Sequence, residues 1–81
     1  MPRYYFQLRD QTYELLDPEG IECSDDDALA GAVLANARDV IAGDAKRGVV
    51  NLRFRIDAED ETGTVVHSLS FTNAVRVLRA G

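Results

Sequence analysis

Cys23 and His67 are the residues of this chain whose types could carry out nucleophilic chemistry. Cys23 lies just before a predicted helix, whose dipole favours the reactive thiolate, and His67, the only histidine, could act as its base. The carboxylates of Glu22 and of residues 25–27 oppose a thiolate, however, and no third group is evident to orient the imidazole. We therefore expect a partly buried structural cysteine and a strand histidine, in a protein that is not an enzyme.

Two clusters of carboxylates, at residues 25–27 and 57–61, could gather a hard cation such as calcium or magnesium. The second cluster fails as a calcium-binding loop. A loop starting at Asp57 has Gly63 in its seventh place instead of its sixth, and Ser68 in its twelfth, where a glutamate is needed. We expect the first cluster to cap a helix and the second to form a solvated hairpin tip, so neither a metal site nor a cofactor is predicted.

Arginines and a tyrosine recur along one face of two predicted strands. Alternate side chains of a strand share a face, and those of 53 and 55 are expected beside those of 3–9. The candidate interaction face consists of Arg3, Tyr5, Gln7, Arg9, Arg53, Arg55 and Ser68. Such residues can stack on and hold single-stranded RNA or DNA, and they are also typical of protein interfaces. An ordinary solvated sheet face is the third interpretation.

The charge of the chain bears on which partner is expected. The net charge is −5, with six acids and no base in residues 17–27 and three further acids at 59–61. Because phosphate binding depends on clustered lysines and arginines, this acidity argues against a general nucleic-acid binder. We predict a non-catalytic interaction module that forms a homodimer or binds a small protein partner, through this face or an exposed strand edge. A nucleic-acid-binding regulatory protein is the alternative.

The length and composition set the scale of the molecule. Residues 1–81 are expected to form a single domain with a small core. No apolar run approaches the roughly 20 residues of a membrane span, and the N-terminus lacks the features of a signal peptide. The one cysteine excludes an internal disulfide. A cytoplasmic protein without membrane contact is therefore predicted.

Strands and one helix are expected to position the candidate residues. Apolar and polar residues alternate along 4–9, 52–58 and 65–71, with the period of two that half-buried strands show. Residues 13–16 could form a short second strand. A helix is predicted over about residues 25–46, because apolar residues recur at i, i+3 and i+4 and aspartates precede them. Residues 74–78 are expected to form a short final strand or a turn.

This order of elements predicts an α+β fold of the type β-β-α-β-β. One helix would pack on a three- to four-stranded, mainly antiparallel sheet. Tyr4, Phe6 and Leu8 are expected to face the helix, which leaves the opposite face of the same strand to the arginines.

Several segments together carry a family resemblance. They are Met1–Phe6, Asp10, the Asp17–Gly20 turn, the alanine-rich helix, Thr62–Val66 and Ser70–Phe71. With these segments the chain resembles a family of small proteins of similar length from soil and plant-associated alphaproteobacteria, classed as a domain of unknown function. The resemblance covers nearly the whole chain and implies the fold, but it brings no catalytic residues.

A second resemblance is to the N-terminal domain of HicB-type antitoxins. Tyr5–Leu8, Gly20 and Asp27–Ala30 are similar to the outline of that domain, in which a strand and a glycine turn lead into an alanine-rich helix. The chain departs from it in its strand pair after the helix and in having no appended DNA-binding segment. The resemblance implies an antitoxin-like regulatory role as part of the nucleic-acid alternative.

Overall fold

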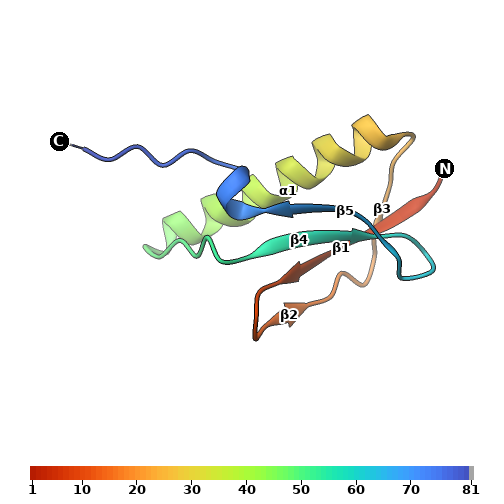
Figure 1. The fold of residues 1–81 in the computed structure, drawn as a ribbon, viewed down its shortest axis with the longest axis horizontal. Helices are drawn as coiled ribbons and strands as arrows, with labels where there is room; N and C mark the ends of the chain where they lie inside the picture. The colour runs from red at the N-terminus through yellow and green to blue at the C-terminus, as the bar shows by residue number, and fades with distance from the viewer. Residues whose placement is uncertain (81) are drawn as a thin grey trace.

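The computed structural model describes residues 1–80, in which one long helix lies across one face of an antiparallel sheet (Figure 1). Its α+β class and the predicted β-β-α-β-β order are confirmed, with one additional two-residue strand before the helix. No helix in this part of the chain combines the length and the apolar character needed to cross a membrane.

The sheet is built around the first strand. On one side, β1 (Arg3–Arg9) pairs with β2 (Glu14–Leu15) and with β3 (Ile21–Glu22), and on the other side it pairs with β4 (Arg55–Glu59). β4 in turn pairs with β5 (Val65–Ser70), and every one of these pairings is antiparallel. Within residues 1–80 the sheet therefore has β5 at one edge and the short strands β2 and β3 at the other.

The helix α1 (Asp26–Lys46) begins and ends close to the predicted residues. Asp25 is its N-cap, since the Asp25 carboxylate accepts a hydrogen bond of 2.8 Å from the Ala28 N–H. At the other end Gly48 adopts a φ of 93°, the left-handed conformation that follows many helices.

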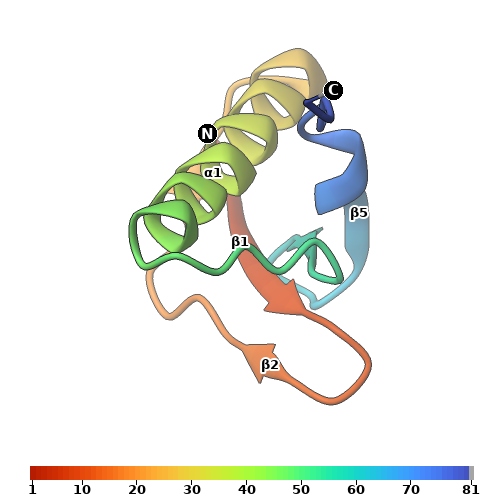
Figure 2. The same cartoon turned by 90° about the vertical axis from the view of Figure 1, so that its left-hand side faces the viewer.

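The core lies between the helix and the sheet, the two layers that the end-on view in Figure 2 shows. Leu29, Val33 and Ala37 of α1 are buried there together with Ile56 and Ala58 of β4. Tyr4, Phe6 and Leu8 pack against this cluster, as predicted from their alternation. β1 therefore presents its other face, with Gln7 and Arg9, away from the helix.

Three elements differ from the predicted ones. β4 starts at Arg55 instead of Leu52, because the Asn51 side chain accepts a hydrogen bond of 2.9 Å from the Arg53 N–H and holds a turn there. The two-residue strand β3 was not expected, since Ile21–Glu22 is too short to show a period. After the 3₁₀ turn η1 (Phe71–Asn73), residues 75–80 form neither helix nor strand.

Candidate interaction surfaces

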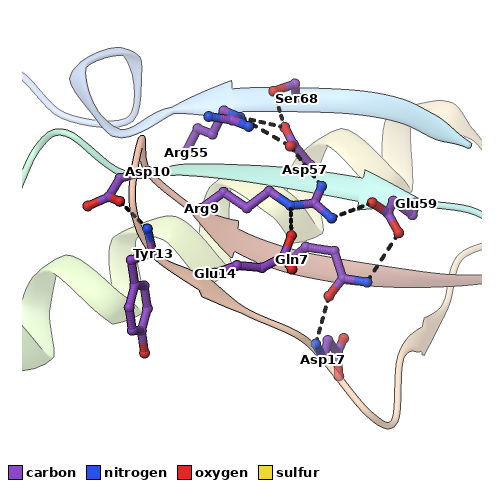
Figure 3. A network of polar contacts seen from close by, with 10 residues as sticks. All are labelled: Gln7, Arg9, Asp10, Tyr13, Glu14, Asp17, Arg55, Asp57, Glu59 and Ser68. Atoms are coloured by element: carbon purple, nitrogen blue, oxygen red, sulfur yellow. Dashed lines mark hydrogen bonds and ion pairs between the residues drawn. The ribbon is translucent and has the colours of Figure 1, made fainter. Parts of the chain in front are cut away.

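Arg9 is the centre of a polar network on the sheet face opposite the helix (Figure 3). Its guanidinium contacts three carboxylates: Glu14 of β2 at 2.6 Å, Asp57 of β4 at 3.0 Å and Glu59 of β4 at 2.8 Å. Hydrogen bonds to Glu14 and Asp57 raise the pKa of Arg9 above its ordinary value, although burial opposes them. Arg9 of β1 thereby forms ion pairs with both neighbouring strands, β2 and β4.

Asp57 is the most enclosed carboxylate of the network, with 5% of the residue exposed. It accepts hydrogen bonds from the Ser68 hydroxyl at 2.7 Å, from Arg9 at 3.0 Å and from Arg55 Nε at 3.1 Å. Burial alone would raise the pKa of the Asp57 carboxyl, but these hydrogen bonds outweigh burial and lower it below the usual value. Asp57 is therefore ionised and fully engaged at neutral pH.

Gln7 connects the network by hydrogen bonds to the loop that precedes β3. Its amide nitrogen donates to Glu59 at 3.3 Å, and its amide oxygen accepts the Asp17 N–H at 2.7 Å. The Asp17 carboxylate in turn accepts the backbone N–H groups of Phe6 and Gly20, each at 3.1 Å. Burial raises the pKa of Asp17, but these backbone hydrogen bonds prevail and lower it. Side chains thus tie the loop to β1 between the two short strands.

The first two residues of the candidate face lie at the other end of β1. The Arg3 guanidinium donates to the Glu19 carbonyl at 2.8 Å and contacts the Glu22 carboxylate at 3.2 Å. The Tyr5 ring packs against Gly20 so closely that a Cβ added there would lie 2.8 Å from it. Arg3 and Tyr5 therefore hold the 17–22 segment instead of standing free.

The structure brings together four of the seven candidate residues, namely Gln7, Arg9, Arg55 and Ser68. Arg53 lies apart from them in the turn before β4, where it is exposed. In the network, two arginines face the three carboxylates of Glu14, Asp57 and Glu59, so the face is not positively charged. Within residues 1–80, no buried side-chain nitrogen or oxygen lacks a hydrogen-bond partner.

The carboxylates considered as cation ligands have other roles here. Asp57 and Glu59 bind Arg9, while Asp60 accepts hydrogen bonds from the backbone N–H groups of Thr62 and Thr64 and so shapes the hairpin tip. No cluster of three or more acidic, histidine or cysteine side chains suited to a metal ion occurs in the described part of the chain. Cys23 is buried and its backbone N–H donates to the Pro2 carbonyl.

The outer backbone edge of β5 takes no part in the network, although the Ser68 side chain does. Phe71 N–H donates to the Phe54 carbonyl at 3.0 Å, which makes 54 and 71 a hydrogen-bonded pair beyond the end of β4 and β5. Because such pairs alternate along antiparallel strands, Ser68 and Ser70 are opposite β4 in non-hydrogen-bonded positions. Their backbone N–H and C=O groups therefore point away from β4, toward the outer edge.

Sequence reasoning missed the partners of Arg9. The sequence predicts Asp57 and Glu59 only as part of an acidic cluster, because their position opposite β1 depends on the register between two strands, which one strand alone does not reveal. In the register that the structure has, Gln7 lies opposite Asp57.

Comparisons with known proteins give one match. Residues 3–72 match the family described as "Domain of unknown function (DUF6894)". Neither the curated proteins nor the solved structures contain a match to the chain. The match spans β1 to the second residue of η1 and includes the whole polar network. The chain therefore belongs to the DUF6894 family.

Proposed function

We propose that this protein is a non-catalytic interaction module that associates with a second copy of itself along the outer edge of β5. The observation that carries the proposal is an edge strand of six residues whose outer side pairs with no strand among residues 1–80. An open strand edge is a template for pairing with another chain, unless charges, prolines, a β-bulge or a covering segment protect it. β5 has one bulge, at Val66, and this bulge lies outside the Ser68–Ser70 stretch.

The composition of β5 offers none of that protection. Its sequence, Val-Val-His-Ser-Leu-Ser, contains no proline and no Asp, Glu, Lys or Arg. Val65 and Val66 are each 47% exposed. Two copies of β5 can pair in antiparallel fashion around a two-fold axis without placing like charges opposite each other, and the outward groups of Ser68 and Ser70 then hydrogen-bond across the axis.

A protein partner is favoured over nucleic acid by the charges of the sheet face. Three of the four arginines of the candidate face are engaged: Arg3 contacts Glu22, Arg55 contacts Asp57, and Arg9 lies among three carboxylates. The fourth, Arg53, lies apart from them in its turn. Phosphate affinity needs free, clustered cations. The same argument counts against the antitoxin-like role. A single buried thiol at Cys23 fits the reducing cytoplasm as the compartment.

Substitution of Val66 by lysine tests the proposal. A charge on the edge strand should prevent pairing along β5, so Val66→Lys is expected to associate more weakly in analytical ultracentrifugation than the unaltered chain does. Val49→Lys is the matched control, because Val49 is 75% exposed and lies outside the sheet. Circular dichroism checks that both variants are folded.

A backbone variant separates hydrogen bonding from charge. Ser70 has a φ of −74°, which suits proline, and its N–H points away from β4. Ser70→Pro should therefore keep the fold and weaken association.

A wild-type chain that is monomeric at high micromolar concentration would overturn the proposal. So would salt-sensitive binding of a single-stranded oligonucleotide that Arg53→Glu with Arg55→Glu abolishes, and this result would favour the nucleic-acid alternative.

A further inference from the structure

The last described segment, residues 75–80, forms an extended arm in which Val75 packs against the core and residues 76–80 are exposed. It leaves η1 and runs away from the body of the molecule (Figure 1). Val77 is 69% exposed and Leu78 is 79% exposed. The arm contains Arg76 and Arg79 and no acid. Its backbone groups from 76 to 80 have no hydrogen-bond partner among residues 1–80. The arm is therefore basic, apolar and open to pairing.

The opposite combination occurs at the sheet edge formed by β2 and β3. We call residues 13–22 the acidic edge, because this segment contains four acids and no base. Those acids are Glu14, Asp17, Glu19 and Glu22. The same segment exposes four large apolar side chains, those of Tyr13, Leu15, Leu16 and Ile21. Among the described residues, no strand pairs with the outer side of β2 or β3.

The arm and the acidic edge of one molecule lie on different sides of the fold. In the end-on view β2 is at the bottom of the sheet, whereas the arm starts from η1 at the top (Figure 2). The arm therefore meets this edge on another copy more readily than on its own. Apolar side chains accompanied by opposite charges on the two segments favour this contact, while repulsion between Arg76 and Arg79 of two copies disfavours arm-to-arm pairing.

We propose that the arm of one copy binds the acidic edge of a second copy as an added strand. The main-chain groups of the arm pair with the open side of β2 and β3, and Val77 and Leu78 cover the exposed apolar side chains there. Arg76 and Arg79 approach the carboxylates of Glu19 and Glu22, of which Glu22 already pairs with Arg3 of its own chain. This contact is separate from the β5 edge, which lies on the other side of the sheet and carries no charge to attract the arm.

A charge exchange between the two segments tests this contact. The arm variant carries Arg76→Glu and Arg79→Glu, and the edge variant carries Glu19→Lys and Glu22→Lys. Each variant alone has like charges on arm and edge, so its association measured by ultracentrifugation should weaken roughly tenfold or more. A mixture of the two variants pairs an acidic arm with a basic edge, and its association should recover.

The control is Arg47→Glu with Arg53→Glu, which changes the net charge as much as the arm variant does but leaves the arm intact. It should associate as the unaltered chain does. Failure of the mixed variants to recover would overturn the inference, as would unchanged association of the two variants alone. An arm variant that loses only binding to anionic lipid vesicles would also overturn it and would assign the arm to a membrane surface. Val66→Lys tests the β5 contact separately, so the two proposals can fail independently.

Discussion

At the scale of single residues, Arg9 shows why a basic sheet face need not be a binding face. The Arg9 side chain is 19% exposed and contacts Glu14, Asp57 and Glu59. Glu14 comes from β2 on one side of β1, and the other two come from β4 on the other side. A partly buried arginine of this kind fixes strand register, because a shift of either neighbouring strand would separate its charges. Its role is therefore to hold the sheet together.

Arg9→Met should destabilise the protein by about 3 kcal/mol, because the substitution leaves Asp57 and Glu59 without their shared cation. Urea denaturation followed by circular dichroism measures the change in the free energy of unfolding. Arg53→Met is the matched control, since Arg53 is exposed in a turn, and its effect should stay within about 0.5 kcal/mol. Equal effects of the two substitutions would contradict the structural role of Arg9.

The Asp57 carboxylate should make stability depend on pH. Its pKa in the folded protein lies below the unfolded value of about 3.9, so its contribution is present above that pH and is lost as the pH falls through the folded-state pKa. The stability difference between the unaltered chain and Asp57→Asn should therefore be constant near neutral pH and shrink below about pH 4. Urea titrations across this range would refute the assignment if the difference did not change.

At the scale of elements, the turn before β3 is set by Gly20. It adopts a φ of 72°, and a Cβ there would lie 2.8 Å from the Tyr4 carbonyl oxygen and from the Tyr5 ring. Gly20→Ala should destabilise the protein by about 2 kcal/mol or more, since it combines an unfavourable φ with a contact to backbone.

Gly31 provides the comparison for this prediction. It lies in α1, and a Cβ there meets no atom within 4 Å. Gly31→Ala should therefore stabilise the protein by about 0.5–1 kcal/mol, because alanine loses less conformational freedom in a helix. Thermal unfolding of the two variants should move in opposite directions, and a shift in the same direction would contradict this account of the turn.

Most elements could be predicted from the sequence because local periodicity determines them. The alternation of residues 3–9 and 65–70 and the apolar stripe of α1 each follow from one segment alone. The partners of Arg9 could not be predicted in this way, since they depend on which residues of β4 lie opposite β1. The start of β4 at Arg55 instead of Leu52 also escaped prediction, because it depends on one side chain, that of Asn51, in a local turn.

At the scale of the whole molecule, the two sheet edges have different chemistry. β5 contains no Asp, Glu, Lys or Arg, whereas the acidic edge contains four acids and the arm contains two arginines. If both edges bind a second copy, one contact rests on backbone hydrogen bonds and apolar contacts and the other partly on charge. Contacts of these two kinds respond differently to salt.

Salt should therefore separate the two contacts. Raising sodium chloride from about 0.05 M to about 0.5 M shortens the range of surface electrostatics to a few ångström and should weaken the arm contact, which depends on exposed charges. Ultracentrifugation of Val66→Lys, in which only the arm contact remains, should show association that falls with salt. The arm variant with Arg76→Glu and Arg79→Glu retains only the β5 contact, and its association should change little, because apolar contacts and backbone hydrogen bonds carry no net charge to screen. The opposite pattern, with a salt-sensitive arm variant and a salt-insensitive Val66→Lys, would contradict both assignments at once.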